Sequence, residues 1–302
     1  MPETLLKAAC FIGIMLLGFL LRSIGFFKEG DFHVLSKIAL KITLPAAIVV
    51  SFSEMKMETS MLIIVALGFG GGIIYLLLAL IMNVRASKDR RAFEILNLPG
   101  YNIGLFAMPF VSEFVGAAGV VATSLFDTGN AFICLGGSYG IAKSVKEGQG
   151  FSFGRILVAL LTSVPFMTYI IMIILNLSGF RLPKEVLSFA EIIRSANTFI
   201  AMLMIGVGFR LRADMKQLGQ ILRIVFVRYL IAALLAGLYY HVFTFLSMDI
   251  RKALVLLAFS PISAAVPAFT AEMKGDAGLS SAVNSICIVC SIVIMTVLMT
   301  II

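Results

Sequence analysis

Residues 97–110 read NLPGYNIGLFAMPF, and residues 258–269 read AFSPISAAVPAF. Each stretch puts proline and glycine inside an otherwise apolar segment. A proline within a helix removes a backbone hydrogen bond and crowds the carbonyl one turn before it. In a bilayer, such an interruption survives only where protein or a water-filled cavity satisfies the freed polar groups. The two stretches therefore predict two broken membrane helices, with the breaks at Pro99, Gly100, Pro109, Pro261 and Pro267.

The whole chain is rich in apolar residues. Of its 302 residues, 60% are hydrophobic and 13% are charged, and the mean hydropathy is +1.06. A soluble domain is nearer 45–50% apolar and about 25% charged. Soluble enzymes, nucleic-acid-binding proteins and disulfide-rich secreted domains are therefore excluded as classes. The chain has a net charge of +8, and its basic residues lie in short loops between apolar blocks. This distribution indicates membrane topology rather than a nucleic-acid partner.

Ten segments are long and apolar enough to cross a bilayer, since a membrane helix needs about 20 mostly apolar residues. They lack the alternation of barrel strands. The sequence thus predicts an all-α polytopic membrane protein with ten transmembrane helices, at 5–21, 33–52, 61–83, 92–114, 117–142, 156–177, 191–209, 218–246, 252–273 and 277–302.

The basic residues predict the orientation of these helices. Sixteen Lys and Arg residues fall in the odd-numbered connections and seven on the other side, which includes the N-terminus. The positive-inside rule places the more basic loops in the cytoplasm. We expect a protein of the cell membrane with both termini outside the cytoplasm.

The ten segments fall into two sets of five. Corresponding segments begin 151 to 160 residues apart, and Pro109 and Pro267 are separated by 158 residues. Asn102 and Ser260 each lie seven residues before these prolines. An odd number of spans per half inverts the second half relative to the first, as in many secondary transporters. We expect two inverted repeats, 1–147 and 148–302; kinked helices that only pack are the alternative.

Broken helices bring helix ends to the middle of the membrane. An N-terminal end suits a carboxylate and a C-terminal end suits a cation. An asparagine amide can also donate to a carboxylate, and glycine allows close approach of a ligand. The expected substrate-binding residues are Asn102, Gly104, Ser260 and Ser263. Close helix packing is the alternative role of the glycines.

The fifth segment contains the one clear intramembrane acid, in SLFDTGNAFICLGG at 124–137. Asp127 shares a helix face with Thr123 and Asn130, and Asn284 lies at the matching depth of the tenth segment. Because an intramembrane carboxylate is costly, it indicates function. Asp127, Asn130 and Asn284 are expected to couple transport to an ion, and a buried aspartate that only packs is the alternative.

Other polar residues give weaker signals. Arg228 is expected to extend toward the cytoplasmic surface, and His33 to lie at the interface. Cys287 and Cys290 form a CxxC without a second cysteine pair or nearby histidine, so we expect simple packing. No catalytic or nucleotide-binding motif is present. The sequence therefore predicts no enzyme, no cofactor and no metal site.

Three stretches carry a family resemblance: NLPGYNIGLFAMPFV at 97–111, ANTFIAMLMIGVGFRL at 196–211 and AFSPISAAVPAFTAEMKGD at 258–276. With these, the chain resembles the auxin efflux carrier family, which includes the plant PIN proteins and many bacterial members. The resemblance implies two inverted five-helix repeats, broken helices four and nine that cross near the midplane, and elevator-like transport of organic anions. The chain lacks the long cytoplasmic loop of many plant members, so regulation through that loop is not carried over.

These features together predict a secondary transporter of a small organic anion, such as an auxin-like or dicarboxylate compound, in either direction. A sodium- or proton-coupled carrier of bile-acid-symporter-like architecture is the alternative of the same class. A membrane-embedded sensor or an intramembrane enzyme is the alternative of another class. The expected partners are the substrate, the lipid bilayer and no nucleic acid. The sequence leaves open H⁺ or Na⁺ coupling and a homodimer.

Overall fold

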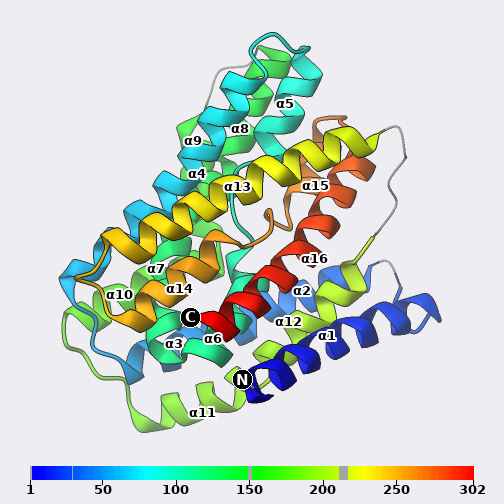
Figure 1. Cartoon of the computed structure of the whole chain (residues 1–302). Coiled ribbons are helices and arrows are strands. Elements are labelled where there is room, and N and C mark those ends of the chain that lie inside the picture. The colour runs from blue at the N-terminus through cyan, green and yellow to red at the C-terminus, as the bar shows by residue number, and fades with distance from the viewer. Residues whose placement is uncertain (1, 29, 149–151, 211–216) are drawn as a thin grey trace.

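The structure is a computed structural model, which describes residues 2–28, 30–148, 152–210 and 217–302. Within these residues all regular secondary structure is helical (Figure 1). The first half contains α1 (Pro2–Ser23), α2 (Asp31–Ile38), α3 (Leu44–Glu54), α4 (Ile63–Met82), α5 (Lys88–Asn97), α6 (Met108–Val115), α7 (Ala117–Phe132) and α8 (Ser138–Glu147). The second half contains α9 (Phe153–Thr162), α10 (Val164–Leu177), α11 (Lys184–Arg194), α12 (Asn197–Gly208), α13 (Leu218–Val242), α14 (Met248–Ala258), α15 (Val266–Glu272) and α16 (Ala277–Ile301).

Several of these helices join into membrane-length helical rods, one of which, Ala117–Glu147, has a kink at Gly136. The described residues contain seven such apolar rods: Leu5–Ser23, Asp31–Glu54, Thr59–Met82, Ala117–Glu147, Lys184–Gly208, Leu218–Val242 and Ala277–Ile301. An eighth segment, α9 with α10, bends by 76° at Ser163, where the backbone is extended. These eight segments correspond to eight of the ten predicted spans. The chain is therefore an all-helical protein with several helices able to cross a membrane.

The fourth and ninth predicted spans are the two that break. Helix α5 ends at Asn97, and the chain has no helix from 98 to 102, where Gly100 has a φ of +78°. Helix α14 ends at Ala258, and α15 begins only at Val266. Proline cannot continue a helix, and glycine accepts a positive φ without strain. The sequence thus predicts both interruptions at the right places.

Two of the predicted break residues act differently from the expectation. Pro109 follows a π-helical turn, Ile103–Ala107, at the start of α6, and Pro267 lies in the first turn of α15. A first-turn proline has no intrahelical partner to lose. The interruptions themselves lie upstream, around Pro99 and Gly100 in one span and Pro261 in the other. Pro267 begins its second half-helix, whereas Pro109 lies within the second half-helix Ile103–Val115, directly after its π-helical turn, so neither proline breaks a first half-helix.

Helices from the two halves pack against each other through small residues. Helix α1 packs along α12, and α10 packs on α3. The α1–α12 pair is in backbone contact, since a Cβ added at Gly206 would lie 1.9 Å from the carbonyl oxygen of Met15. Helices α4 and α7 approach in the same way, at Gly68 and Gly129. Such contacts between small residues are typical of membrane helix pairs.

Candidate functional site

The two helix breaks lie side by side in the interior. The backbone N–H of Asn102 donates to the carbonyl of Pro261 at 2.8 Å, so the interrupted segments are hydrogen-bonded directly. The Arg228 side chain, from the middle of α13, is 1% exposed and donates to carbonyls of both breaks. The expectation that Arg228 extends to the surface is wrong. Backbone acceptors left without helical donors bind its guanidinium in the interior instead.

A cavity of about 330 Å³ opens beside the first break. Its lining includes three of the four expected substrate-binding residues: Asn102, Gly104 and Ser263. Asp127, Asn130 and Tyr169 complete its polar wall. The fourth expected residue, Ser260, is fully buried, and its hydroxyl has no hydrogen-bond partner. Its backbone carbonyl, rather than its side chain, takes part in the site by accepting from Arg228.

Asp127 is held by two neutral donors. The Asn130 amide donates to one carboxylate oxygen at 2.8 Å, and the Tyr169 hydroxyl donates to the other at 2.9 Å. No Lys, Arg or His of the described residues forms an ion pair with Asp127. Thr123, expected on the same polar face, is fully buried, with no partner for its hydroxyl. The carboxylate therefore lines the cavity with two neutral donors as its hydrogen-bond partners.

Asn130 connects this carboxylate to the broken backbone. Its Oδ1 accepts from the backbone N–H of Tyr101 at 3.0 Å, and its Nδ2 donates to the carbonyl of Tyr101 at 3.0 Å. The same Nδ2 donates to Asp127, and the Cys134 thiol donates to Oδ1 at 3.2 Å. One buried amide thus fixes the position of Tyr101, next to Asn102, and contacts the acid.

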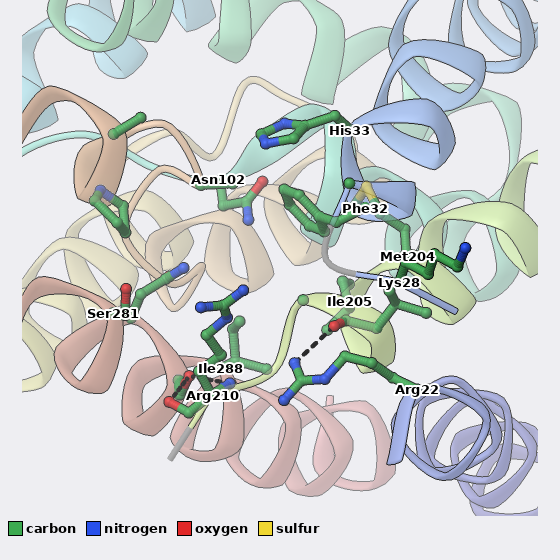
Figure 2. A pocket seen from close by; sticks show the side chains of 18 residues that line it. Arg22, Lys28, Phe32, His33, Asn102, Met204, Ile205, Arg210, Ser281 and Ile288 are labelled. Carbon is green, nitrogen blue, oxygen red and sulfur yellow. Dashed lines mark hydrogen bonds between the residues drawn. The ribbon is translucent and has the colours of Figure 1, made fainter. Parts of the chain in front are cut away.

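A second cavity, of about 560 Å³, also has Asn102 in its wall (Figure 2). Basic side chains of Arg22, Lys28, His33 and Arg210 line it, and no Asp or Glu of the described residues does. Phe32, His33 and Asn102 belong to the walls of both cavities. The Asn102 side chain makes no hydrogen bond within the described part of the chain. It is free to donate to a ligand from either side.

Asn284 is in this second cavity, apart from Asp127. Ser281, Asn284 and Ser285 of α16 form part of its wall, and the Oδ1 of Asn284 is buried without a partner. The two residues at matching depth are therefore not brought together. Residues of both halves line each of the two cavities.

Sequence reasoning missed most of the basic wall. Arg22 lies in the last turn of α1 and Arg210 follows α12, and the sequence pattern indicates only an orientation signal for both. Arg22 donates to the carbonyls of Val207 and Phe209, each at 2.8 Å, which draws it inward from the end of α1. His33, expected at the interface, lies in the walls of both cavities. Nothing in the local sequence distinguishes these side chains from ordinary loop cations.

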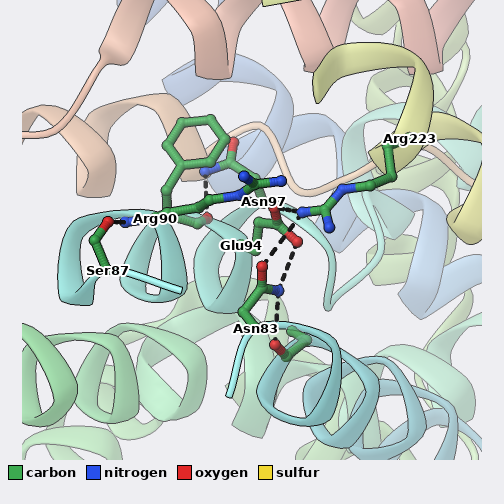
Figure 3. A network of polar contacts seen from close by, with 8 residues as sticks. Asn83, Ser87, Arg90, Glu94, Asn97 and Arg223 are labelled. Atoms are coloured by element: carbon green, nitrogen blue, oxygen red, sulfur yellow. Dashed lines mark hydrogen bonds and ion pairs between the residues drawn. The ribbon is translucent and has the colours of Figure 1, made fainter. Parts of the chain in front are cut away.

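A buried acid outside the cavities ties three helices together (Figure 3). Glu94 of α5, which is 2% exposed, pairs with Arg223 of α13 and accepts from the Nδ2 of Asn83 at 2.6 Å. Arg90, one turn before, lies 3.5 Å from the same carboxylate. The network anchors the first half-helix of the broken span. No three His, Cys, Asp or Glu residues within the described ranges could hold a metal together.

Comparison with known proteins agrees with the resemblance. The family model for membrane transport proteins matches residues 7–152. This range nearly coincides with the first predicted repeat, 1–147. No curated protein matches the chain. The family expected from the resemblance is thereby confirmed for residues 7–152, which match the model of the membrane transport protein family, the family of the auxin efflux carriers.

Proposed function

We propose that the chain is a secondary transporter that carries a small organic anion across the cell membrane by alternating access. The observation that carries this proposal is the position of Asn102. Its amide lies at the junction of the two helix breaks and lines both cavities. A substrate bound there contacts broken backbone from both halves. Membrane transporters bind their substrates and ions at such discontinuous helices.

The contacts between halves support an inverted repeat of 1–147 and 148–302. Thr43 and Asn197 are 154 residues apart, and the Thr43 hydroxyl donates to the Asn197 Oδ1 at 2.8 Å. Two residues that correspond to each other can touch only near the symmetry axis that relates them. A pseudo-two-fold axis between the π-helical turn Ala39–Thr43 and α12 would produce this contact, which supports the repeat.

A second pair of contacts obeys the same relation. Arg22, at the end of α1, donates to carbonyls that close α12. Asn176, which is 154 residues further along, donates to the carbonyls of Phe52 and Met55 at the end of α3, at 2.6 and 2.7 Å. In both contacts, a residue at the end of the first span of one half donates to the carbonyls at the end of the second span of the other half. Ten spans in two inverted repeats account for both contacts.

The charge of the second cavity favours an anionic substrate. Its charged lining residues are basic, and Asn102 adds an uncommitted amide donor. In a low-dielectric site, a carboxylate needs such charged and neutral donors to replace its hydration. The volume of about 560 Å³ lies within the range of small-molecule sites. An auxin-like monocarboxylate and a dicarboxylate both fit this chemistry.

The charge of the first cavity favours a coupling ion. Asp127 is the one acid in its wall, and Asn130 connects that acid to the backbone beside Asn102. A proton or Na⁺ at Asp127 changes the hydrogen bond that Asn130 donates. The change reaches the break directly through Tyr101. Elevator-like movement of the site across the membrane follows from the family resemblance.

Transport in proteoliposomes tests the proposal. A panel of radiolabelled organic anions is assayed for uptake and counterflow, with proton and sodium gradients imposed separately. The wild-type protein is expected to accumulate one class of anion with one gradient. Asp127→Asn is expected to keep counterflow and lose the response to the gradient, because it keeps the shape but not the charge. Full gradient-driven uptake by this variant would exclude Asp127 as the coupling residue.

Asn102→Ala tests the binding residue. Loss of a hydrogen bond to a charged ligand costs roughly 1.5–3 kcal/mol, so affinity is expected to fall about tenfold to a hundredfold. Ser260→Ala is the matched control, since its hydroxyl lines neither cavity. Unchanged affinity in folded Asn102→Ala protein would remove this residue from the site.

A further inference from the structure

Three backbone carbonyls from the two helix breaks converge on one point. Helix α5 ends just before Leu98 and Gly100, and helix α14 ends just before Ser260. At the end of a helix the last carbonyls have no intrahelical donor and carry negative partial charge. Two such ends that meet inside a membrane protein form a site for a cation.

The guanidinium of Arg228 occupies this point. Nη1 donates to the carbonyl of Leu98 at 2.7 Å, and Nη2 donates to those of Gly100 at 2.8 Å and Ser260 at 2.7 Å. The rings of Tyr75 and Tyr101 face the guanidinium, with centroids 5.1 and 5.3 Å from its carbon. Carbonyls and aromatic faces both stabilise a cation without neutralising it.

No carboxylate within the described part of the chain compensates this buried charge. Arg228 forms no ion pair within the described residues, although it is 1% exposed. A buried charge without an opposite charge is costly unless dipoles replace its hydration. The two features therefore stabilise each other. The guanidinium offsets the negative partial charge of the helix-end carbonyls, and these carbonyls replace the hydration that the guanidinium loses on burial.

We propose that Arg228 is a resident cation that fills a monovalent-cation site formed by the carbonyl ends of the two broken helices. The site would otherwise take an inorganic ion from solution. A covalently held cation cannot leave, so this point does not exchange ions during transport. Asp127 is then the remaining place for a coupling ion, a consequence that rests on the proposed transport function. The cation site itself does not depend on that function.

The predicted repeat explains why one arginine suffices. Spans three and eight begin 157 residues apart, so Gly71 corresponds to Arg228. The hydroxyls of Tyr101 and Tyr239 fill the space beside Gly71, 2.6 and 3.2 Å from where a Cβ would lie. A second arginine has no room there. The single guanidinium serves both breaks.

Removal of the side chain tests the proposal in the detergent-purified full chain. Arg228→Ala leaves the carbonyl site open, and Arg251→Ala is the control. Arg251 also donates to a backbone carbonyl, that of Tyr240 at 3.0 Å, and lies over a tyrosine ring, but away from the breaks. Melting temperatures are compared in about 100 mM choline, sodium or methylguanidinium chloride, since a ligand stabilises the folded state that binds it.

Because the proposed transport function allows Na⁺ at Asp127, every protein in this comparison also carries Asp127→Asn. Arg228→Ala is expected to melt lower in choline than the protein with Arg228 intact and to regain about 2–4 °C in sodium or methylguanidinium, in a saturable manner. In that background, the protein with Arg228 intact and the Arg251→Ala variant are expected to melt at the same temperature in all three salts. An Arg228→Ala protein without a cation response would overturn the proposal. The same saturable response in the protein with Arg228 intact would also overturn it, because the site would then not be filled.

If Arg228→Ala does not survive purification, Arg228→Lys and Arg228→Gln in the same Asp127→Asn background decide the matter. Lysine keeps the charge, and glutamine keeps a donor without charge. Arg228→Lys is expected to be the more stable of the two and indifferent to sodium, whereas Arg228→Gln gains stability from it. Equal loss in both variants would show an ordinary structural arginine. These measurements require no transport activity, so failure of the proposed function would appear separately, as absence of counterflow in wild type.

Discussion

Replacing Asn130 by alanine is expected to loosen the first helix break and to lower the stability of the fold. The Asn130 amide makes a pair of hydrogen bonds to the backbone of Tyr101, each 3.0 Å long, and one to Asp127 at 2.8 Å. Tyr101 is 2% exposed and lies where the backbone has no helical partners. The N–H and carbonyl of Tyr101 would lose these hydrogen bonds together.

The loss of stability in Asn130→Ala can be estimated from the backbone N–H and carbonyl of Tyr101. A buried backbone group left without a partner costs about 1–3 kcal/mol. The Tyr101 N–H loses its partner, whereas the Tyr101 carbonyl keeps the Cys134 thiol at 3.6 Å, so the two groups together give about 2–4 kcal/mol. We expect Asn130→Ala to lose about 2–4 kcal/mol. Substrate affinity is expected to fall as well, because Asn102 directly follows Tyr101.

Thr128→Ala on the same helix is the matched control. Thr128 is also buried, but its hydroxyl donates only to the Ser124 carbonyl one turn before. We expect a loss below about 1 kcal/mol. Because the chain has no tryptophan, unfolding is followed with a thiol-reactive dye that reports exposure of buried Cys287. Equal melting temperatures for the two variants would refute the role assigned to Asn130.

Three other outcomes are expected. Gly206→Ala should separate α1 from α12 and lower the melting temperature, because the new Cβ would lie 1.9 Å from a backbone oxygen of α1. Gly237→Ala is the control and should leave the melting temperature unchanged, because no atom lies within 4 Å of its Cβ position. Equal effects of the two substitutions would contradict the close packing of α1 on α12. Glu94→Gln should cost about 1–3 kcal/mol in thermal unfolding through loss of its ion pair with Arg223, and an unchanged melting temperature would show that the pair contributes nothing. Glu147→Cys in a cysteine-free background should react only with membrane-permeant reagents added outside; labelling by an impermeant reagent would reverse the predicted orientation.

The breaks could be predicted from the sequence because their causes are local. Proline lacks a donor wherever it stands, and Gly100 accepts a positive φ by its own chemistry. The span lengths follow from bilayer thickness, a constant of the solvent. The break residues and the span lengths can both be recognised within a short stretch of sequence. The bend at Ser163, which Pro165 follows closely, belongs to the same class and was within reach of the same reasoning.

The contacts that build the site could not be predicted in this way. Arg228 is one basic residue in an apolar helix, and a surface position suits that pattern equally well. Its burial depends on carbonyls 32 to 130 residues away in the chain. The role of Asn130 toward Tyr101 is likewise a contact over 29 residues. Hydropathy carries no information on which backbone groups a fold leaves without helical partners. Such backbone groups determine where the side chains of Arg228 and Asn130 lie.

The differences between the two halves bear most directly on mechanism. On the proposed repeat, Asp127 corresponds to Asn284 and Arg228 to Gly71, so each half carries one charged residue where the other carries a neutral one. If the two halves were identical, the two cavities that share Asn102 would have the same lining. A coupling ion and an anionic substrate would then compete for both cavities. The observed lining is instead acidic in one cavity and basic in the other. On the proposed function, the ion and the anion would bind at once, next to the same amide, without competing for one pocket, and their opposite charges would favour joint occupancy. The difference between Asp127 and Asn284 supplies the acidic side of this arrangement. The basic side comes from Arg22, Lys28, His33 and Arg210 rather than from Arg228, which lines neither cavity.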